Sequence, residues 1–129
     1  MRDIKNNLDG VSSIGPASYT ASTNGSGVDV RDFDGAMVVF QAGTADTGNG
    51  DETYTPSVEE SDDNSSFSAV AASDLEGALV NMTANSVQRA GYKGAKRYVR
   101  AVLTLGGTTP SINASALVVR GLPYLAPVA

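Results

Sequence analysis

Apolar and polar residues alternate in short segments along this chain, and turn-forming residues separate the segments. The alternation is clearest over residues 96–105, where the apolar positions of one face are Val99, Ala101, Leu103 and Leu105. Residues 112–120 repeat it, with one face made of Ile112, Ala114, Ala116 and Val118. Because successive side chains of a β-strand point to opposite faces, both segments are predicted to be strands with one buried face.

Several other segments have the composition of strands. The apolar run Ala36–Ala42 is too short for a helix and predicts a central strand that is covered on both faces. Residues 54–60 contain Pro56, which has no N–H to donate to a neighbour, so this strand is predicted at a sheet edge or with a bulge. The remaining predicted strands cover residues 17–24, 28–33, 67–70 and 86–91, and residues 74–77 are expected to make one helical turn.

These segments and the turns between them predict an all-β fold. We expect an antiparallel β-sandwich or jelly-roll-like barrel of about seven to eight short strands with little helix. Jelly-roll and immunoglobulin-like strand orders both fit the pattern. The predicted organisation is an N-terminal arm (residues 1–16), a β-sandwich domain (17–120) and an extended C-terminal tail (121–129).

The composition narrows the possible chemistry. The 129 residues include no His and no Cys, which removes Ser–His–Asp catalysis, thiolate metal sites and disulfides. The sequence also lacks a nucleophile motif and a glycine-rich phosphate loop. We therefore expect a protein that is not an enzyme, with no catalytic residue, cofactor or metal. No segment approaches the roughly 20 apolar residues of a membrane span, so no membrane partner is expected.

Charge is distributed unevenly along the chain. Residues 1–76 hold all 14 acidic residues and 3 basic ones, whereas residues 77–129 hold 6 basic residues and no acidic one. Acidic and basic strands could lie side by side and neutralise each other. Alternatively, the molecule could have one acidic and one basic face suited to docking. A nucleic-acid partner is not expected, because six bases in a net-acidic chain make at most a small patch.

Six acidic residues lie within VEESDDNSSFSAVAASDLEG, residues 58–77, and three interpretations compete. An EF-hand calcium loop that starts at Asp62 fails, because Phe67 stands where the loop requires Gly; an irregular calcium site stays open. A catalytic pair is disfavoured, since Glu59 and Glu60 would point to opposite faces of a strand. The favoured interpretation is a β-hairpin whose turn spans residues 61–66, because short polar side chains cap such turns.

The chain resembles a family of small structural proteins of tailed-bacteriophage virions, usually described as head decoration or cement proteins. The segments that carry the resemblance cover nearly the whole chain: MRDIKNNLDGVSSIGPASYT with GVDVRDFDGAMVV, VEESDDNSSFSAVAASDLEG, VQRAGYKGAKRYVRAVLTL and SALVVRGLP. These motifs carry no chemistry, and the family has no catalytic residues to transfer.

The resemblance implies a protein that binds the outer surface of an assembled capsid and bridges neighbouring subunits. It implies the major capsid protein as partner, a homo-oligomer with a trimer favoured, and a place on the virion after synthesis in the host cytoplasm. Residues 1–15 and 121–129 are candidate arms. The candidate contact residues are the cations Arg2, Lys5, Arg89, Lys93, Lys96, Arg97 and Arg100.

Two alternatives remain at this stage. One is a different virion part, such as a neck connector, a tail-tube subunit or a fibre subunit. The other is a carbohydrate-binding β-sandwich module, which would stack sugars on exposed aromatic rings. The chain has no Trp, so the possible stacking platforms are Tyr19, Tyr54, Tyr92, Tyr98 and Tyr124.

Overall fold

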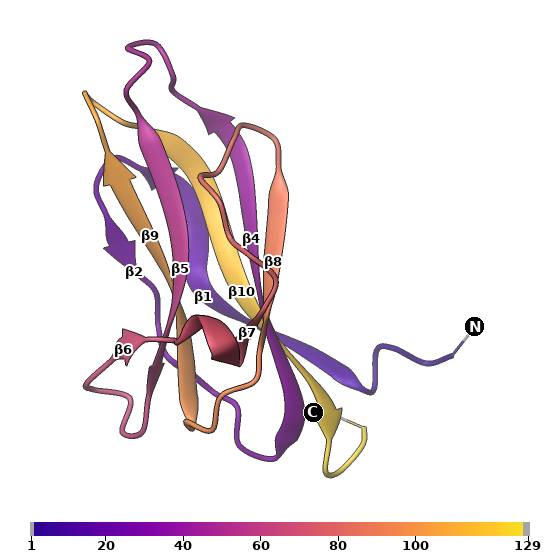
Figure 1. Ribbon diagram of the computed structural model, residues 1–129. Helices are drawn as coiled ribbons and strands as arrows, with labels where there is room; N and C mark the ends of the chain where they lie inside the picture. Colours follow the sequence, from indigo (N-terminus) through magenta and orange to yellow (C-terminus); the bar gives the residue numbers. More distant parts are fainter. Residues whose placement is uncertain (1, 128–129) are drawn as a thin grey trace.

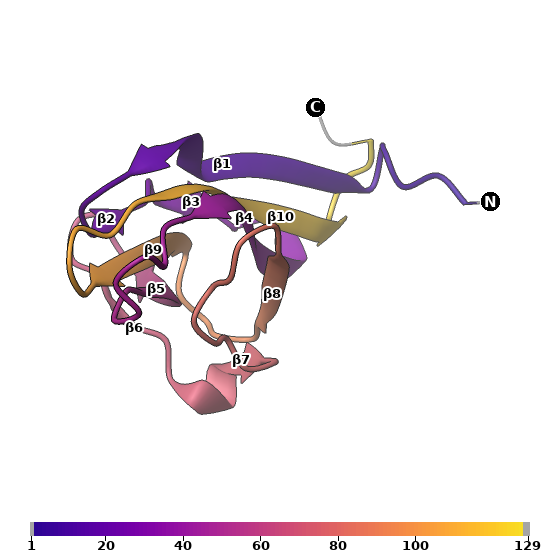
Figure 2. The same cartoon turned by 90° about the horizontal axis from the view of Figure 1, so that it is seen from above.

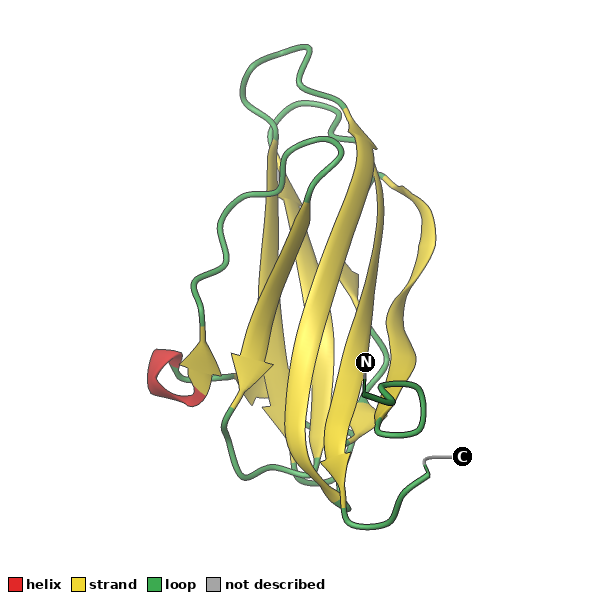
Figure 3. Ribbon diagram, turned by 90° about the vertical axis from the view of Figure 1, so that its right-hand side faces the viewer, coloured by secondary structure: helices red, strands yellow, loops and turns green. Residues whose placement is uncertain are grey.

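A computed structural model describes residues 2–127 of the chain and confirms the all-β prediction. Two antiparallel five-stranded sheets pack face to face as a β-sandwich (Figures 1 and 2). Figure 3 shows strands along most of the chain and one helical turn, η1 (Ala72–Asp74). Within the described residues, no helix has the length and apolar character that a membrane crossing requires.

The first sheet, sheet A, contains both the first and the last strand of the chain. Its strand order is β1–β10–β4–β8–β7. The strands are β1 (Leu8–Tyr19), β10 (Ile112–Pro123), β4 (Phe33–Ala45), β8 (Val87–Tyr92) and β7 (Leu75–Glu76). Immunoglobulin constant domains place their first and last strands in different sheets, so the strand order here differs from theirs.

The second sheet, sheet B, is built around β9 and β5. Its strands are β9 (Tyr98–Gly106), β5 (Thr53–Ser61), β6 (Ser68–Ala69), β2 (Thr23–Asn24) and β3 (Val28–Asp29). β6 pairs with β5 only at Glu59 and Glu60, so Pro56 lies where β9 is the only described strand beside β5. The prediction of an edge position for Pro56 is therefore confirmed.

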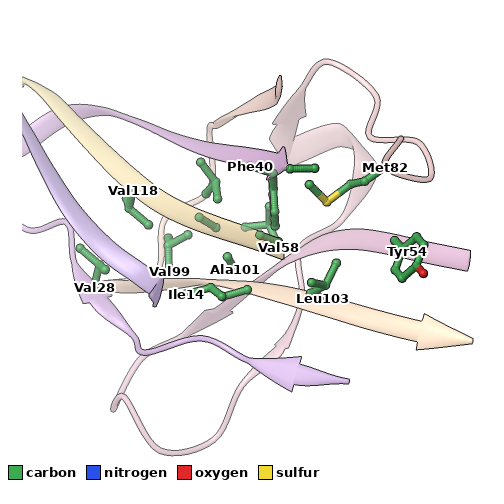
Figure 4. Packing of buried hydrophobic residues seen from close by; sticks show 14 of the residues in the cluster. Ile14, Val28, Phe40, Tyr54, Val58, Met82, Val99, Ala101, Leu103 and Val118 are labelled. Atoms are coloured by element: carbon green, nitrogen blue, oxygen red, sulfur yellow. The ribbon is translucent and has the colours of Figure 1, made fainter. Parts of the chain in front are cut away.

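The core lies between the sheets and contains the two faces predicted from alternation. In β9, Val99, Ala101 and Leu103 are at most 1% exposed. The predicted face of β10 is also buried, and Figure 4 shows side chains of both sheets pointing towards one another. Burial of each large apolar side chain stabilises the fold by about 1.5–3 kcal/mol.

A β-bulge in β1 joins the two sheets along one side of the sandwich. The pairing with β10 shifts between Ser12 and Ile14, which turns Ser13 towards sheet B. The Ser13 hydroxyl donates to the Ser26 carbonyl (2.8 Å) and accepts from the Ala101 N–H (2.9 Å). Gly25 permits this close approach, because a Cβ there would lie 2.7 Å from the Ala101 carbonyl oxygen.

The opposite side of the sandwich is covered by residues 77–86, between β7 and β8 (Figure 1). Met82 of this segment is 4% exposed, and its N–H donates to the Tyr54 carbonyl (2.7 Å). The Gln88 amide binds both the N–H (2.9 Å) and the carbonyl (2.8 Å) of Val80. An irregular segment thus closes the core where the sheets have no shared strand.

Several boundaries differ from the sequence prediction. β1 begins at Leu8, so residues 8–16 belong to sheet A and the arm is shorter than predicted. β10 continues to Pro123, so residues 121–123 of the predicted tail are also strand. The helical turn ends before Leu75, where β7 begins. Met1 of the predicted arm and residues 128–129 of the predicted tail lie outside the described residues.

The structure also has more strands than the sequence predicted. Residues 2–127 form ten strands, and the additional ones are among β2, β3, β6 and β7, which are each only two residues long. Such short pairings have no sequence period of their own, so alternation cannot reveal them.

Candidate docking surface

Most of the predicted contact cations are engaged in ion pairs within the chain. The pairs are Lys93–Glu76, Lys96–Asp62, Arg97–Asp29 and Arg100–Glu59, and Arg120–Asp9 adds a fifth. Each pair joins a base from residues 77–129 to an acid from residues 1–76. The structure therefore follows the first charge interpretation, in which segments of opposite charge lie side by side and neutralise each other.

Arg100 and Glu59 form the pair with the most enclosed geometry among those in sheet B. They lie opposite each other on β9 and β5, and Arg100 donates from Nε (2.8 Å) and Nη2 (2.5 Å) to one Glu59 oxygen. Their side chains are only 20% and 24% exposed. The guanidinium also lies 4.0 Å from the centre of the Phe67 ring. Arg100 thus fastens the β5–β6 hairpin to β9.

The other pairs of the predicted cations are more exposed. Arg97 donates to Asp29 (2.8 Å), and this hydrogen bond holds the pKa of the Asp29 carboxyl below its ordinary value. The Asp62 carboxylate, 2.6 Å from Lys96 Nζ, raises the pKa of the Lys96 ammonium. Lys93 lies 3.0 Å from Glu76, with both side chains at least half exposed. Lys93, Lys96 and Arg97 therefore form ion pairs within the chain.

Arg2, Lys5 and Arg89 complete the predicted set. They are exposed, and none forms an ion pair within residues 2–127. Arg2 and Lys5 precede β1, whereas Arg89 lies on β8. Of the seven predicted contact residues, these three keep a charge that is available to a partner.

The acidic stretch forms the hairpin that the sequence favoured. β5 and β6 pair at Glu59 and Glu60, and the turn between them caps itself. One Asp63 oxygen accepts from the N–H groups of Ser65 and Ser66 (both 2.9 Å), and these bonds lower the pKa of Asp63. No group of three or more acidic residues in the described chain is arranged to hold a metal ion.

Glu60 is bound to a tyrosine instead of facing open solvent. The Tyr92 hydroxyl donates to Glu60 (2.7 Å) and accepts from the Lys96 N–H (3.0 Å). Burial, followed by the neighbouring Glu60, raises the pKa of the Tyr92 phenol. This neutral phenol bridges β5, β8 and the loop before β9, so the arrangement has the character of a structural link between the sheets.

Exposed large apolar side chains lie on both terminal segments, where the two ends of the chain leave sheet A. β1 and β10 pair at Leu8 and Gly121, which brings the two terminal segments to one end of the molecule (Figures 1 and 2). We call this group the terminal corner: Ile4 (65% exposed), Leu8 (42%), Leu122 (70%), Tyr124 (65%) and Leu125 (84%). Among the large apolar side chains that the structure describes, Val80, Val87 and Leu117 are the other exposed ones.

Local hydrogen bonds hold the two terminal segments in place. Asp3 accepts from the side chain of Asn6 (2.6 Å), and the Leu8 N–H donates to the Ile4 carbonyl (3.0 Å). On the other segment, the Tyr124 N–H donates to the Asp32 carbonyl (3.0 Å). The terminal segments are therefore shaped before they meet any partner.

Leu122 is strained as well as exposed. Its φ of 52° lies in the left-handed region, which bulky side chains rarely adopt. Its side chain lies over Gly35, just as that of Leu8 lies over Gly121. Strain at an exposed apolar residue is a feature that clusters at binding sites. A cleft of about 460 Å³ borders this corner, lined by Phe33, Pro123, Tyr124 and Leu125 among others.

The outer face of sheet A continues this apolar surface. The inward positions of β4 and β10 are buried, so the alternate side chains point outward. They form cross-strand rows, Val119–Met37–Gly91 and Leu117–Val39–Arg89, which lie next to the row that contains Leu8. We call these two rows the outer face. Sheet B instead carries Thr55, Thr104 and the Arg100–Glu59 pair on its outer side.

Comparison with known proteins found no matching family model, no matching curated protein and no matching solved structure. The candidate surface therefore rests on the residues of this chain.

The sequence predicts both termini as arms, but it does not show that they lie at the same end of the molecule. It also misses the outer face, because it predicts the run Ala36–Ala42 to be covered on both sides. In the structure Val38 and Phe40 are buried, while Met37 and Val39 are partly exposed. The signal in the sequence is the continuous apolar run Ala36–Ala42, which gives β4 apolar side chains on its outer side as well as on its inner side.

Proposed function

We propose that this chain is a non-enzymatic structural protein of a tailed-phage virion. It binds the outer surface of the assembled capsid and stabilises the lattice by bridging subunits of the major capsid protein. Its copies act together, in a trimer in the favoured arrangement, so that avidity reinforces weak individual contacts.

The observation that carries this proposal is the terminal corner. Soluble monomers rarely gather large apolar side chains at one exposed place unless they bind something there. Here Ile4, Leu122 and Leu125 are each at least 65% exposed, and they come from the two ends of the chain. Hydrogen bonds hold their segments in shape, which reduces the entropy lost on binding.

The electrostatic part of the mechanism differs from the one the sequence suggested. Lys93, Lys96, Arg97 and Arg100 are committed to carboxylates of the same chain. Docking is therefore apolar in its main part. Arg2 and Lys5 flank Ile4 and would steer the corner towards acidic patches on the shell.

No observation favours a carbohydrate-binding module over this reading. Tyr54 and Tyr92 are buried in the core, at 2% and 9% exposure. Of the five tyrosines only Tyr124 is exposed, and a single ring offers a small stacking surface.

The proposal is tested by co-sedimentation with capsid shells that have been stripped of this protein. Leu122→Gly is the most informative variant, because glycine accepts the positive φ and the fold keeps or gains stability while the apolar side chain is lost. We expect Leu122→Gly and Leu125→Ser each to weaken binding about tenfold or more, which is the effect of roughly 1.4 kcal/mol.

Val80→Ser is the matched control. Val80 is 64% exposed, like the corner residues, but belongs to the segment that covers the opposite side of the sandwich. We expect its binding to equal that of the unaltered chain. Equal binding by all three variants would remove the corner from the mechanism, and no binding by the unaltered chain would refute the capsid role itself.

A further inference from the structure

The outer face of sheet A is an unusual surface for one side of a β-sandwich. An antiparallel sheet with one solvated face normally alternates apolar residues inward with polar residues outward. Sheet B follows this rule over most of β5 and β9, with Val102 as an exception, whereas β4 and β10 place Met37, Val39, Leu117 and Val119 outward. Leu117 remains 39% exposed and the other three are partly exposed, so residues 2–127 leave this face at least partly open.

Arg89 is the charged member of this surface. It lies directly opposite Val39 in a row that continues to Leu117, and no described carboxylate forms an ion pair with it. The nearest acidic position along the sheet, Glu76 opposite Gly91, is already paired with Lys93. An apolar row that ends in an available guanidinium fits a complementary row that ends in a carboxylate.

A second copy of this chain does not supply that complement. Its outer face has the same two rows, and the one acidic residue at the end of a row, Glu76 opposite Gly91, is already paired with Lys93 of its own copy. Stacking two copies face to face would bury Arg89 beside a carboxylate that Lys93 already holds, and burying a charged group without a partner of its own is unfavourable. The charge of the face therefore selects a different protein surface.

We infer that the outer face binds a second, chemically distinct protein surface, one that is apolar and provides an Asp or Glu to Arg89. This inference rests on the proposed function, in which that surface belongs to the capsid shell. The face adjoins the terminal corner through Leu8, whose side chain lies over Gly121. Corner and face together give the two contact areas that a clamp between neighbouring subunits needs.

The test compares two charge reversals in the same co-sedimentation assay with stripped shells. Arg89→Glu places a negative charge on the outer face and should weaken binding about tenfold or more, with a smaller loss for Arg89→Gln. Arg31→Glu is the control, because it changes the net charge equally at an exposed loop residue outside the face. Arg31→Glu should bind within about twofold of the unaltered chain.

The outcomes separate this inference from the proposed function. If the unaltered chain binds shells and the two reversals have equal effects, the role of Arg89 is wrong and the capsid role stands. If the unaltered chain does not bind, both are wrong. Sedimentation velocity of the free protein tests whether a second copy of the chain binds the face instead. If the free protein forms an oligomer that Arg89→Glu or Leu117→Glu dissociates, the face belongs to a second copy and the inference is overturned.

Discussion

Single residues decide how closely the two sheets approach each other. Ser13 and Gly25 meet where β1 bends towards sheet B. A Cβ atom at Gly25 would lie only 2.7 Å from the Ala101 carbonyl oxygen. Gly25 thus marks a close backbone approach.

We expect Gly25→Ala to destabilise the fold by about 1–3 kcal/mol, because the added methyl group forces the backbone apart. Gly15→Ala provides the control, since a Cβ at Gly15 would meet nothing within 4 Å. Urea unfolding of both variants measures the difference. Equal urea midpoints of the two variants would show that the backbone around Ser13 and Gly25 accommodates the methyl group without a loss of stability.

Asp29 gives a pH dependence whose sign follows from its hydrogen bond with Arg97. The folded-state pKa of Asp29 lies below its ordinary value of 3.8, so the charged form stabilises the fold. This contribution is complete above the pKa of the unfolded chain and is lost as the pH falls through the lower folded-state value.

We expect Asp29→Asn to lower the melting temperature at pH 7 and to bring the two proteins closer together below about pH 4. Thermal melts between pH 7 and pH 2.5 measure this. A difference in melting temperature that stayed constant over the whole range would argue against the Arg97 bond as its cause.

Among the elements, the strands with strong alternation could be predicted from sequence and the irregular ones could not. The inward residues of β9 from Val99 to Leu103 and of β10 from Ile112 to Val118 are buried at every second position, so these faces were visible in the sequence. Residues 8–16 of β1 are not predicted as strand, because β1 is an edge strand rich in Gly and Ser, with a bulge that shifts its period. The two-residue strands depend on their neighbours and have no local signal.

The pairing of β5 with β9 gives a prediction about ion pairs. Arg100→Gln should destabilise the fold by about 1–2 kcal/mol, because it removes two charge-assisted hydrogen bonds at a site that is only about one-fifth exposed. Lys93→Gln, at a half-exposed pair, should stay within about 0.5 kcal/mol. Chemical denaturation of both variants tests the contrast, and equal losses would contradict it.

At the scale of the whole molecule, charge and apolar surface have separate tasks. Five of the six bases in the second part of the chain pair with acids of the first part at the surface of the same molecule, where they fasten strands and loops. The sequence could show the imbalance but not its use, because pairing depends on which strands become neighbours. The corner was equally hidden, since Leu8 and Gly121 meet only through the antiparallel pairing of the first and last strands.

The most direct test of the virion role is the copy number of this protein in purified particles. Virions banded on a density gradient are compared for the amounts of this chain and of the major capsid protein. The proposed function predicts amounts comparable to those of the capsid subunit. A few copies per particle would indicate a connector or tail part, and absence from the particle would contradict the virion role.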